Sequence, residues 1–198
     1  MVRFYASTSR RFLVLMLKEP RPGRVKTRLG RDLGMVDAAW WFRHQSVSLI
    51  RRVQDARWRT VLAVTPDAAG AGGHIWPAHL PRWPQGPGDL GDRMGRIFRS
   101  LPPGPVVIVG GDIPGITRGH VWRAFAALGS SQAVFGPAPD GGYWLIGLKR
   151  TNAVPGGLFK GVRWSTAYTL TDTTATLGGH SISKVDMLRD VDTVRDLI

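Results

Sequence analysis

Apolar residues recur along the chain in short continuous runs and in helical stripes. The run at 12–17 is apolar throughout and ends at Lys18, which predicts a buried strand. The apolar positions between Val36 and Val53 lie broadly on one face of a following helix, and 60–64 is typical of a second strand. A Gly/Pro-rich stretch at 66–88 then predicts an extended loop. The first third of the chain therefore alternates strand, helix and strand.

The remaining pattern continues this alternation to the end of the chain. A helix is expected from Leu90 to Leu101, with Asp89 near its N-terminus, and another around Val121–Leu128. Strands are expected at 105–109, 133–136, 143–148 and 181–185, and helices at 166–177 and directly after Asp192. Alternating strands and helices predict an α/β domain with a mostly parallel sheet.

Composition narrows the classes of protein that fit this pattern. The 198 residues are 43% apolar and suit a single domain over 1–198, with 1–10 as a flexible N-terminal extension. The chain has no cysteine, which excludes disulfides, thiolate zinc sites and cysteine nucleophiles and favours the cytoplasm. The apolar run at 12–17 is too short for a signal sequence or a membrane span. Composition does not distinguish a monomer from a homo-oligomer.

Positive charge is concentrated at the start of the chain. The net charge is +13, and residues 1–60 hold 14 Lys and Arg against 4 Asp and Glu. Such a segment predicts an anionic ligand, although a solvated arginine-rich surface would look the same. The sequence has no aromatic-rich single-strand signature, recognition-helix motif or lysine-rich tail, which favours a nucleotide phosphate over nucleic acid.

A basic loop directly follows the first predicted strand. Loops at this position face the ligand crevice of an open α/β sheet. Glycine allows the backbone to approach a ligand closely, while lysine and arginine supply charge and forked donors for phosphate oxygens. The loop is neither a Walker A motif nor GxGxxG, and an exposed basic connection remains the alternative. The expected nucleotide and phosphate ligands are Lys18, Pro20, Gly23, Lys26, Thr27 and Arg28.

Asp112 follows the predicted strand at 105–109 in the segment Gly110-Gly111-Asp112-Ile113-Pro114. A carboxylate at the mouth of the sheet is suited to a hard cation such as Mg²⁺, which often takes only one or two protein ligands. The alternative is an aspartate that organises a turn through a bond to the backbone.

Two later segments add carboxylates and aromatic rings. Asp140, Gly141, Gly142, Tyr143 and Trp144 predict the rim of an acceptor site, with an Asp-Gly hairpin and core aromatics as the alternative. In Asp190-Val191-Asp192-Thr193, either aspartate is placed to approach a metal, and helix capping by Asp192 is the alternative.

Together these segments resemble a bacterial family of uncharacterised glycosyltransferase-A-like transferases, associated with radical-SAM or selenium-related genes, in the nucleotide-diphospho-sugar transferase superfamily. The opening loop is also similar to that of phospholactate guanylyltransferases. The resemblance spans nearly the whole chain and rests on residues 18–29, 88–94, 111–114, 136–144 and 190–193. It implies a single Rossmann-like, GT-A-type three-layer α/β/α domain with a mostly parallel mixed sheet.

The resemblance also implies roles for individual residues. Asp112 matches the superfamily's metal-binding aspartate, and Asp192 matches a late Asp-Thr-x-x-Asp-Leu segment of cytidylyltransferases, with Asp190 as its rival. The DxD pair of ordinary glycosyltransferases is missing, because Gly110 and Gly111 precede Asp112. This departure favours nucleotidyl transfer over glycosyl transfer.

We therefore expect a transferase that moves a nucleotidyl group from a nucleoside triphosphate to a small acceptor and releases pyrophosphate. The expected catalytic residues are Lys26, Arg28 and Asp112, and the expected cofactor is Mg²⁺ or Mn²⁺ held by Asp112 and Asp192. A glycosyltransferase that uses a nucleotide-sugar and a non-catalytic nucleotide-binding protein are the alternatives.

Overall fold

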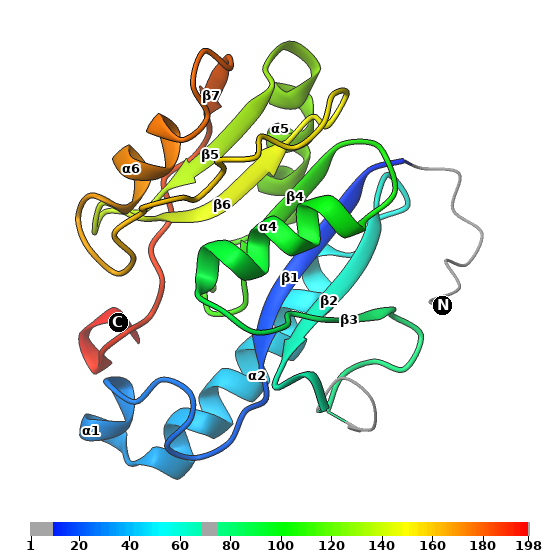
Figure 1. Ribbon diagram of the computed structural model, residues 1–198. Helices are drawn as coiled ribbons and strands as arrows, with labels where there is room; N and C mark the ends of the chain where they lie inside the picture. The colour runs from blue at the N-terminus through cyan, green and yellow to red at the C-terminus, as the bar shows by residue number, and fades with distance from the viewer. Residues whose placement is uncertain (1–9, 69–74, 198) are drawn as a thin grey trace.

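The computed structural model describes residues 10–68 and 75–197, and these form one seven-stranded sheet between two layers of helices (Figure 1). The strand order is β3-β2-β1-β4-β6-β5-β7. All neighbouring strands are parallel except that β6 runs antiparallel to β4 and β5. The predicted three-layer α/β fold with a mostly parallel mixed sheet is confirmed.

The elements alternate along the chain largely as the apolar pattern predicts. The strands are β1 Phe12–Lys18, β2 Arg59–Thr65, β3 Arg82–Pro84, β4 Val106–Gly110, β5 Ala133–Pro137, β6 Tyr143–Leu148 and β7 Ile182–Lys184. The helices are α1 Leu29–Leu33, α2 Met35–Val53, α4 Leu90–Ser100, α5 Arg118–Ser130 and α6 Thr169–Ala175, with a 3₁₀ turn η1 at Val194–Leu197.

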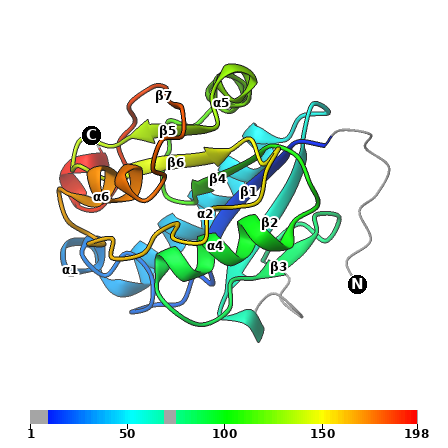
Figure 2. The same ribbon diagram turned by 45° about the horizontal axis from the view of Figure 1, so that its top comes forward.

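Alternate side chains of β1 build the two halves of the core. Leu13, Leu15 and Leu17 pack on one face with apolar residues of α2 and α5. Phe12 and Val14 point to the other face, where α4 and the segment around α6 cover them. Successive side chains of a strand point to opposite faces, so a central strand buried on both sides is apolar throughout. Figure 2 shows the helices on the two sides of the sheet.

Some boundaries differ from the prediction. The stretch predicted as a loop at 66–88 contains the short edge strand β3, which pairs with β2, and the basic loop leads into the five-residue helix α1, which begins at Leu29. The helix predicted at 166–177 is shorter, and the final helix is the single turn η1. The proposed extension at 1–10 lies almost wholly outside the described residues. A single domain over 1–198 stays a prediction, and none of the described helices is long and apolar enough to cross a membrane.

Candidate functional site

The site lies at the edge of the sheet where β1 and β4 end. These two strands are parallel neighbours, with Met16 opposite Gly110, so Lys18 and Asp112 leave the sheet on the same side. The chain passes from β1 to β2 and β3 on one side and returns to β4 on the other. Open α/β sheets bind ligands at such a switch point, outside the carboxyl ends of the strands.

The loop that carries Asp112 is packed tightly against β1. A Cβ added at Gly111 would lie 2.5 Å from the Cδ2 atom of Leu17, so only glycine fits there without a shift. The hydroxyl of Ser46, in α2, donates to the carbonyl of Gly111 at 3.3 Å. A Cβ at Gly110 would lie 2.9 Å from Ile113 Cδ1 and 3.0 Å from Asp112 Oδ1, so a side chain there would require these two side chains to shift.

Lys26 lies between the two predicted metal ligands. Its Nζ atom is 2.7 Å from Asp112 Oδ2 and 2.9 Å from Asp192 Oδ1, and its side chain is only 6% exposed. Burial opposes the charged form, but attraction to Asp112 and hydrogen bonds to both carboxylates outweigh burial and raise the pKa of Lys26. The ammonium is therefore charged and is held by Asp112 and Asp192.

Hydrogen bonds within residues 191–196, and from this segment to the Asp112 loop, hold Asp192 in position. The backbone N–H of Val191 donates to the carbonyl of Asp112 at 3.3 Å, which fastens this segment to the Asp112 loop. Asp196 Oδ2 accepts the backbone N–H groups of Asp192 and Thr193 at 3.2 and 2.8 Å. Asp196 thus accepts the hydrogen bonds of the backbone N–H groups in this turn, and the carboxylate of Asp192 faces Lys26 and Arg28.

Asp190 lies near the same group of charges. Burial, followed by repulsion from Asp192 and Asp112, raises the pKa of Asp190. The Nζ atom of Lys26 forms ion pairs with Asp112 and Asp192, which favours Asp192 over Asp190 as the partner of Asp112. The structure therefore brings the two predicted metal ligands together.

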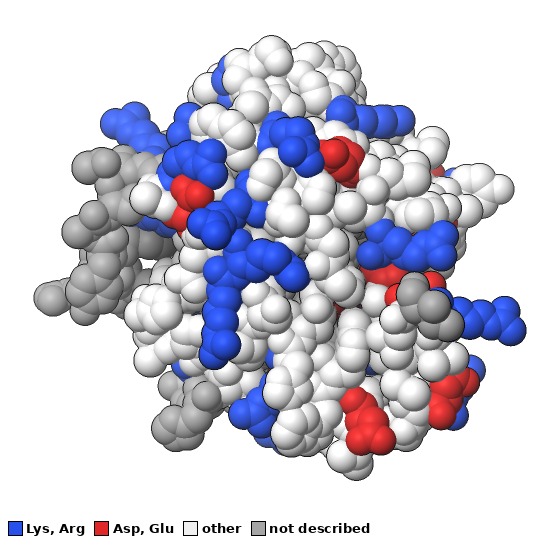
Figure 3. Space-filling view, turned by 180° about the vertical axis from the view of Figure 1, so that it is seen from behind, with Lys and Arg blue, Asp and Glu red and all other residues white. Residues whose placement is uncertain are grey.

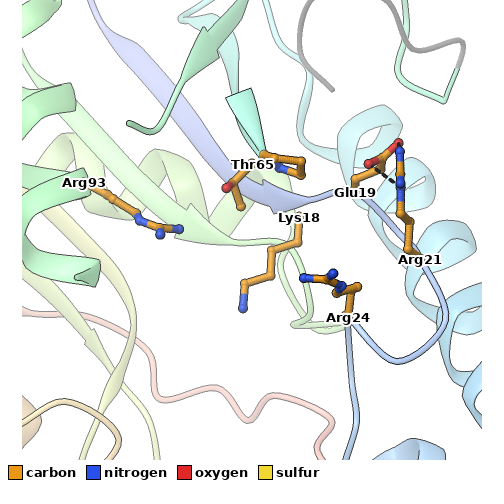
Figure 4. A pocket seen from close by; sticks show the side chains of 7 residues that line it. Lys18, Glu19, Arg21, Arg24, Thr65 and Arg93 are labelled. Carbon is orange, nitrogen blue, oxygen red and sulfur yellow. Dashed lines mark hydrogen bonds and ion pairs between the residues drawn. The ribbon is translucent and has the colours of Figure 1, made fainter. Parts of the chain in front are cut away.

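A cavity of about 360 Å³ opens at the ends of β1 and β2, and β1 is the parallel neighbour of β4, which leads into Asp112. Figure 4 shows Lys18, Arg24 and Arg93 pointing toward it, and Thr65 and Pro66 also line its wall. Glu19 and Arg21 form an ion pair at its rim, with Arg21 Nε 2.7 Å from Glu19 Oε2. Among the described residues, Lys18 and Arg24 contact no carboxylate. The cavity therefore presents uncompensated positive charge, which suits an anion.

The basic loop is thus divided between two environments. Lys18 faces the cavity, whereas Lys26 and Arg28 are bound to carboxylates, with Arg28 Nη1 3.0 Å from Asp192 Oδ2. Gly23 takes a φ of 71° with open space around it, Pro20 is half-buried, and Thr27 is exposed. The structure therefore does not place all six predicted residues around one phosphate position.

Arg93 and Arg24 were not predicted as ligands from the sequence. Arg93 lies in the first turn of α4, and its Nε atom donates to the carbonyl of Gly88 at 3.0 Å. The buried Gln85 donates to the carbonyls of Leu17 and Ala63, which ties the ends of β1 and β2 together beside the cavity. Arg93 appeared in the sequence within the segment that carries the family resemblance, and only the tertiary structure brings it to the cavity.

The predicted acceptor residues separate into a surface turn and two aromatic rings, of which Trp144 is buried and Tyr143 is partly buried. Asp140 Oδ1 accepts the N–H of Gly142 at 2.9 Å, and Gly141, at φ 85°, has no room for a Cβ against the carbonyl of Ala167. Trp144 is 4% exposed and donates to the carbonyl of Asp186. Burial raises the pKa of Tyr143, whose ring packs edge-on against Phe135. Asp140 lies at the surface, but the two rings are not an open acceptor rim here.

The donor set is suited to a sparsely ligated divalent cation. Oxygens of Asp112 and Asp192 converge on one cationic atom, so they are placed to share a metal ion. Within 10–68 and 75–197, no group of three or more His, Asp or Glu is arranged to hold a metal without other ligands. Mg²⁺ commonly binds one or two carboxylates and completes its shell with water and substrate phosphates. The two residues fit that pattern.

Comparison with known families gives a match over more than half of the chain. Residues 49–166 match the family described as "Uncharacterized protein conserved in bacteria (DUF2064)". The matched segment includes Arg93, Asp112 and Asp140, while the basic loop and Asp192 lie outside it. None of the curated proteins matches the chain.

Solved structures with a similar fold include the following three. A protein of Desulfovibrio desulfuricans G20, named as a candidate nucleotide-diphospho-sugar transferase, is 30% identical, with a TM-score of 0.84 over 96% of this chain and 85% of that one. The inositol-1-phosphate CTP transferase of T. maritima is 12% identical, with a TM-score of 0.58 over 98% and 94%. Rv0371c of Mycobacterium tuberculosis H37Rv in complex with manganese is 16% identical, with a TM-score of 0.55 over 96% and 97%. The last two likenesses establish the fold alone.

Proposed function

The chain belongs to the bacterial protein family DUF2064, and we propose that it is a metal-assisted nucleotidyltransferase. The enzyme class, a transferase, is that of its relative from Desulfovibrio desulfuricans and of the inositol-1-phosphate CTP transferase that shares its fold. The donor is a nucleoside triphosphate and the acceptor is a small phosphorylated or hydroxylated molecule. The expected location, the cytoplasm, rests on the absence of cysteine and stays a prediction.

The observation that carries this proposal is that a positive cavity and a pair of carboxylates lie at the ends of neighbouring strands. Lys18, Arg24 and Arg93 face the cavity, and Asp112 and Asp192 converge at the end of the neighbouring strand. A polyphosphate that lies in the cavity and reaches toward the carboxylates would meet positive charge along its length. Such an arrangement suits a triphosphate better than a neutral ligand.

Each group has a separate role in the proposed reaction. Lys18, Arg24 and Arg93 bind and orient the phosphates, and Asp112 and Asp192 hold Mg²⁺ or Mn²⁺. The bound cation would neutralise charge on the phosphate oxygens. An acceptor oxygen forms a bond to the α-phosphorus while the bond from that phosphorus to the bridging oxygen breaks, so pyrophosphate leaves. Once the phosphates are bound, Lys26 and Arg28 would stabilise charge on that leaving group, and Asp140 would serve the acceptor side.

A matched pair of arginine variants tests the phosphate site. Arg93 and Arg99 both lie on α4, but only Arg93 lines the cavity. We expect Arg93→Ala to weaken binding of a nucleoside triphosphate by about 1.5–3 kcal/mol, because a charge-assisted hydrogen bond is lost. Arg99→Ala removes the same charge from the same helix and should leave the affinity nearly unchanged. Calorimetric titration of both variants measures the difference, and equal affinities would remove the cavity from the site.

Glycosyl transfer is the second candidate because the relative at 30% identity is named for nucleotide-diphospho-sugars. The two reactions release different products from a panel of donors and acceptors. Pyrophosphate supports nucleotidyl transfer, and a nucleoside diphosphate supports glycosyl transfer. Tight binding with neither product across the panel would instead support a non-catalytic nucleotide-binding protein.

A further inference from the structure

Lys26 occupies the space that a shared metal ion needs. Its Nζ atom lies 2.7 Å from Asp112 Oδ2 and 2.9 Å from Asp192 Oδ1. A divalent cation bound between the same two oxygens would approach each of them to about 2.0–2.6 Å. The ammonium and the cation therefore cannot occupy this position together.

The same contacts explain how the two carboxylates remain close together without a metal. Two converging carboxylates repel each other, and a buried cation between them offsets that repulsion. The side chain of Lys26 is 6% exposed, whereas that of Arg28, which contacts only Asp192, is 69% exposed. Lys26 is therefore the principal counterion of the pair, and Arg28 is a peripheral one.

We propose that Lys26 is an internal counterion that competes with the divalent cation for Asp112 and Asp192 and moves to the nucleotide phosphates when the cation enters. This inference rests on the proposed function. Lys26 follows Arg24 by two residues in the loop after β1, and Arg24 and Lys18 line the cavity assigned to the phosphates. The site consequently takes a complex of a divalent cation with a nucleotide, and it binds the free cation weakly.

Competition between Lys26 and the free cation determines how far the affinity for the cation is reduced. Apparent affinity falls in proportion to the fraction of protein that is competent to bind. If Lys26 leaves the carboxylates unoccupied in about a tenth of molecules or fewer, the free cation binds about tenfold or more weakly than it would without the lysine. Coupling between two ligands is reciprocal. A nucleotide that draws Lys26 away therefore increases the affinity for the metal, and the metal increases the affinity for the nucleotide by the same factor.

The test measures binding of free Mn²⁺ without nucleotide, by electron paramagnetic resonance of the unbound ion. Lys26→Met removes the ammonium and keeps an unbranched side chain, and we expect it to bind Mn²⁺ about tenfold or more tightly than the wild type. Lys26→Arg keeps the charge and should bind as weakly as the wild type. Arg28→Met removes a cation from one carboxylate only and should have a smaller effect. Equal or weaker Mn²⁺ binding by Lys26→Met would overturn the proposal.

Two further measurements keep the outcome interpretable. Adding Asp112→Asn to Lys26→Met should abolish the gain, and a gain that survives would place the ion elsewhere and overturn the proposal. The melting temperature of Lys26→Met should be lower than that of the wild type in EDTA. It should recover in Mn²⁺, because a ligand that binds the folded state stabilises it. The titration contains no nucleotide. If Lys26→Met does not bind Mn²⁺ more tightly but nucleotide binding depends on Arg93, only the counterion role is rejected. If the wild type does not bind nucleotide, the proposed function is rejected.

Discussion

The side chain of Asp112 contacts a lysine from a distant part of the chain. Its Oδ2 atom is 2.7 Å from Lys26 Nζ, and its backbone carbonyl accepts the N–H of Val191. The backbone contact does not depend on the charge of the side chain. The two contacts therefore separate the structural contribution of Asp112 from its proposed role as a metal ligand.

Asp112→Asn is expected to retain the fold and lose the metal response. Asparagine has nearly the same size and makes the same turns as aspartate, but it lacks the negative charge. We expect transfer to fall by about 10–100-fold or more, as when support for a metal site is lost. The gain in nucleotide affinity on adding Mg²⁺ should also shrink, and calorimetry with and without Mg²⁺ measures it.

Thermal unfolding in EDTA provides the control for this variant. Because Asp112 is also the ion-pair partner of the buried Lys26, the melting temperature of the variant in EDTA should fall, as it should for Lys26→Met. A single cooperative transition above the assay temperature, combined with lost Mg²⁺ dependence, supports the ligand role. Wild-type turnover with the same Mg²⁺ dependence would contradict it.

At the scale of single residues, the sequence predicted which residues belong to the site better than it predicted their contacts. The resemblance identified Asp112 and Asp192, and the structure brings both to Lys26. Arg93 could not be predicted as a cavity residue, because a polar position on a helix gives no sign of what the helix faces. Tyr143 and Trp144 follow a Gly-Gly pair and look like a binding rim. Their burial depends on β6 lying between β4 and β5, which local sequence does not show.

At the scale of elements, α6 and the loop before it form one unit with the turn that carries Asp140. The N–H of Leu170 donates to the carbonyl of Gly141 at 3.0 Å. The guanidinium of Arg163 binds Asp172 at 2.8 and 2.9 Å, and its backbone N–H donates to the same carboxylate at 3.1 Å. Asp172 therefore fastens the loop to α6, and the loop covers the turn.

This unit predicts a pH-dependent contribution to stability. Hydrogen bonds from Arg163 lower the pKa of Asp172 to about 2 from its ordinary value of 3.8. A carboxyl whose pKa is lowered by folding stabilises the folded state above its unfolded pKa, and this stabilisation is lost as the pH falls toward the folded pKa. The difference in melting temperature between wild type and Asp172→Asn should therefore be largest above pH about 4 and shrink toward pH about 2.

Melting curves at several pH values between these limits measure the difference. Asp32→Asn, at an exposed position of α1, is the matched control and should follow the wild type across the range. A constant difference between wild type and Asp172→Asn over this range would contradict the assignment.

Element boundaries were predictable where the apolar pattern is long. The strands β1, β2 and β4 are buried on both faces and appear as continuous apolar runs. The strand β3 has three residues and ends in proline, and pairing with β2 at the edge of the sheet defines it. The helix α1 has five residues and directly follows the basic loop. Elements this short depend on tertiary contacts, so local pattern cannot predict them.

At the scale of the whole molecule, positive charge extends beyond the site. Figure 3 shows Lys and Arg side chains over the face opposite the view of Figure 1, with fewer Asp and Glu between them. The net charge of +13 therefore attracts any polyanion at low ionic strength, whether or not it enters the cavity. Binding to the site must be distinguished from binding to this surface.

Salt dependence makes that distinction. Each phosphate neutralised on duplex DNA releases counterions, so a protein that makes 6–10 such contacts loses about 10³–10⁵ in affinity between about 50 and 200 mM salt. A nucleoside triphosphate has far fewer phosphates, so its affinity should fall much less over the same range. Nucleotide binding should also depend on Arg93, whereas DNA binding spread over the surface should be insensitive to Arg93→Ala. Titration of both ligands at several salt concentrations, with wild type and Arg93→Ala, tests this. A steep salt slope for DNA together with no nucleotide binding would identify the positive surface, and not the cavity, as the principal anion-binding feature of the molecule.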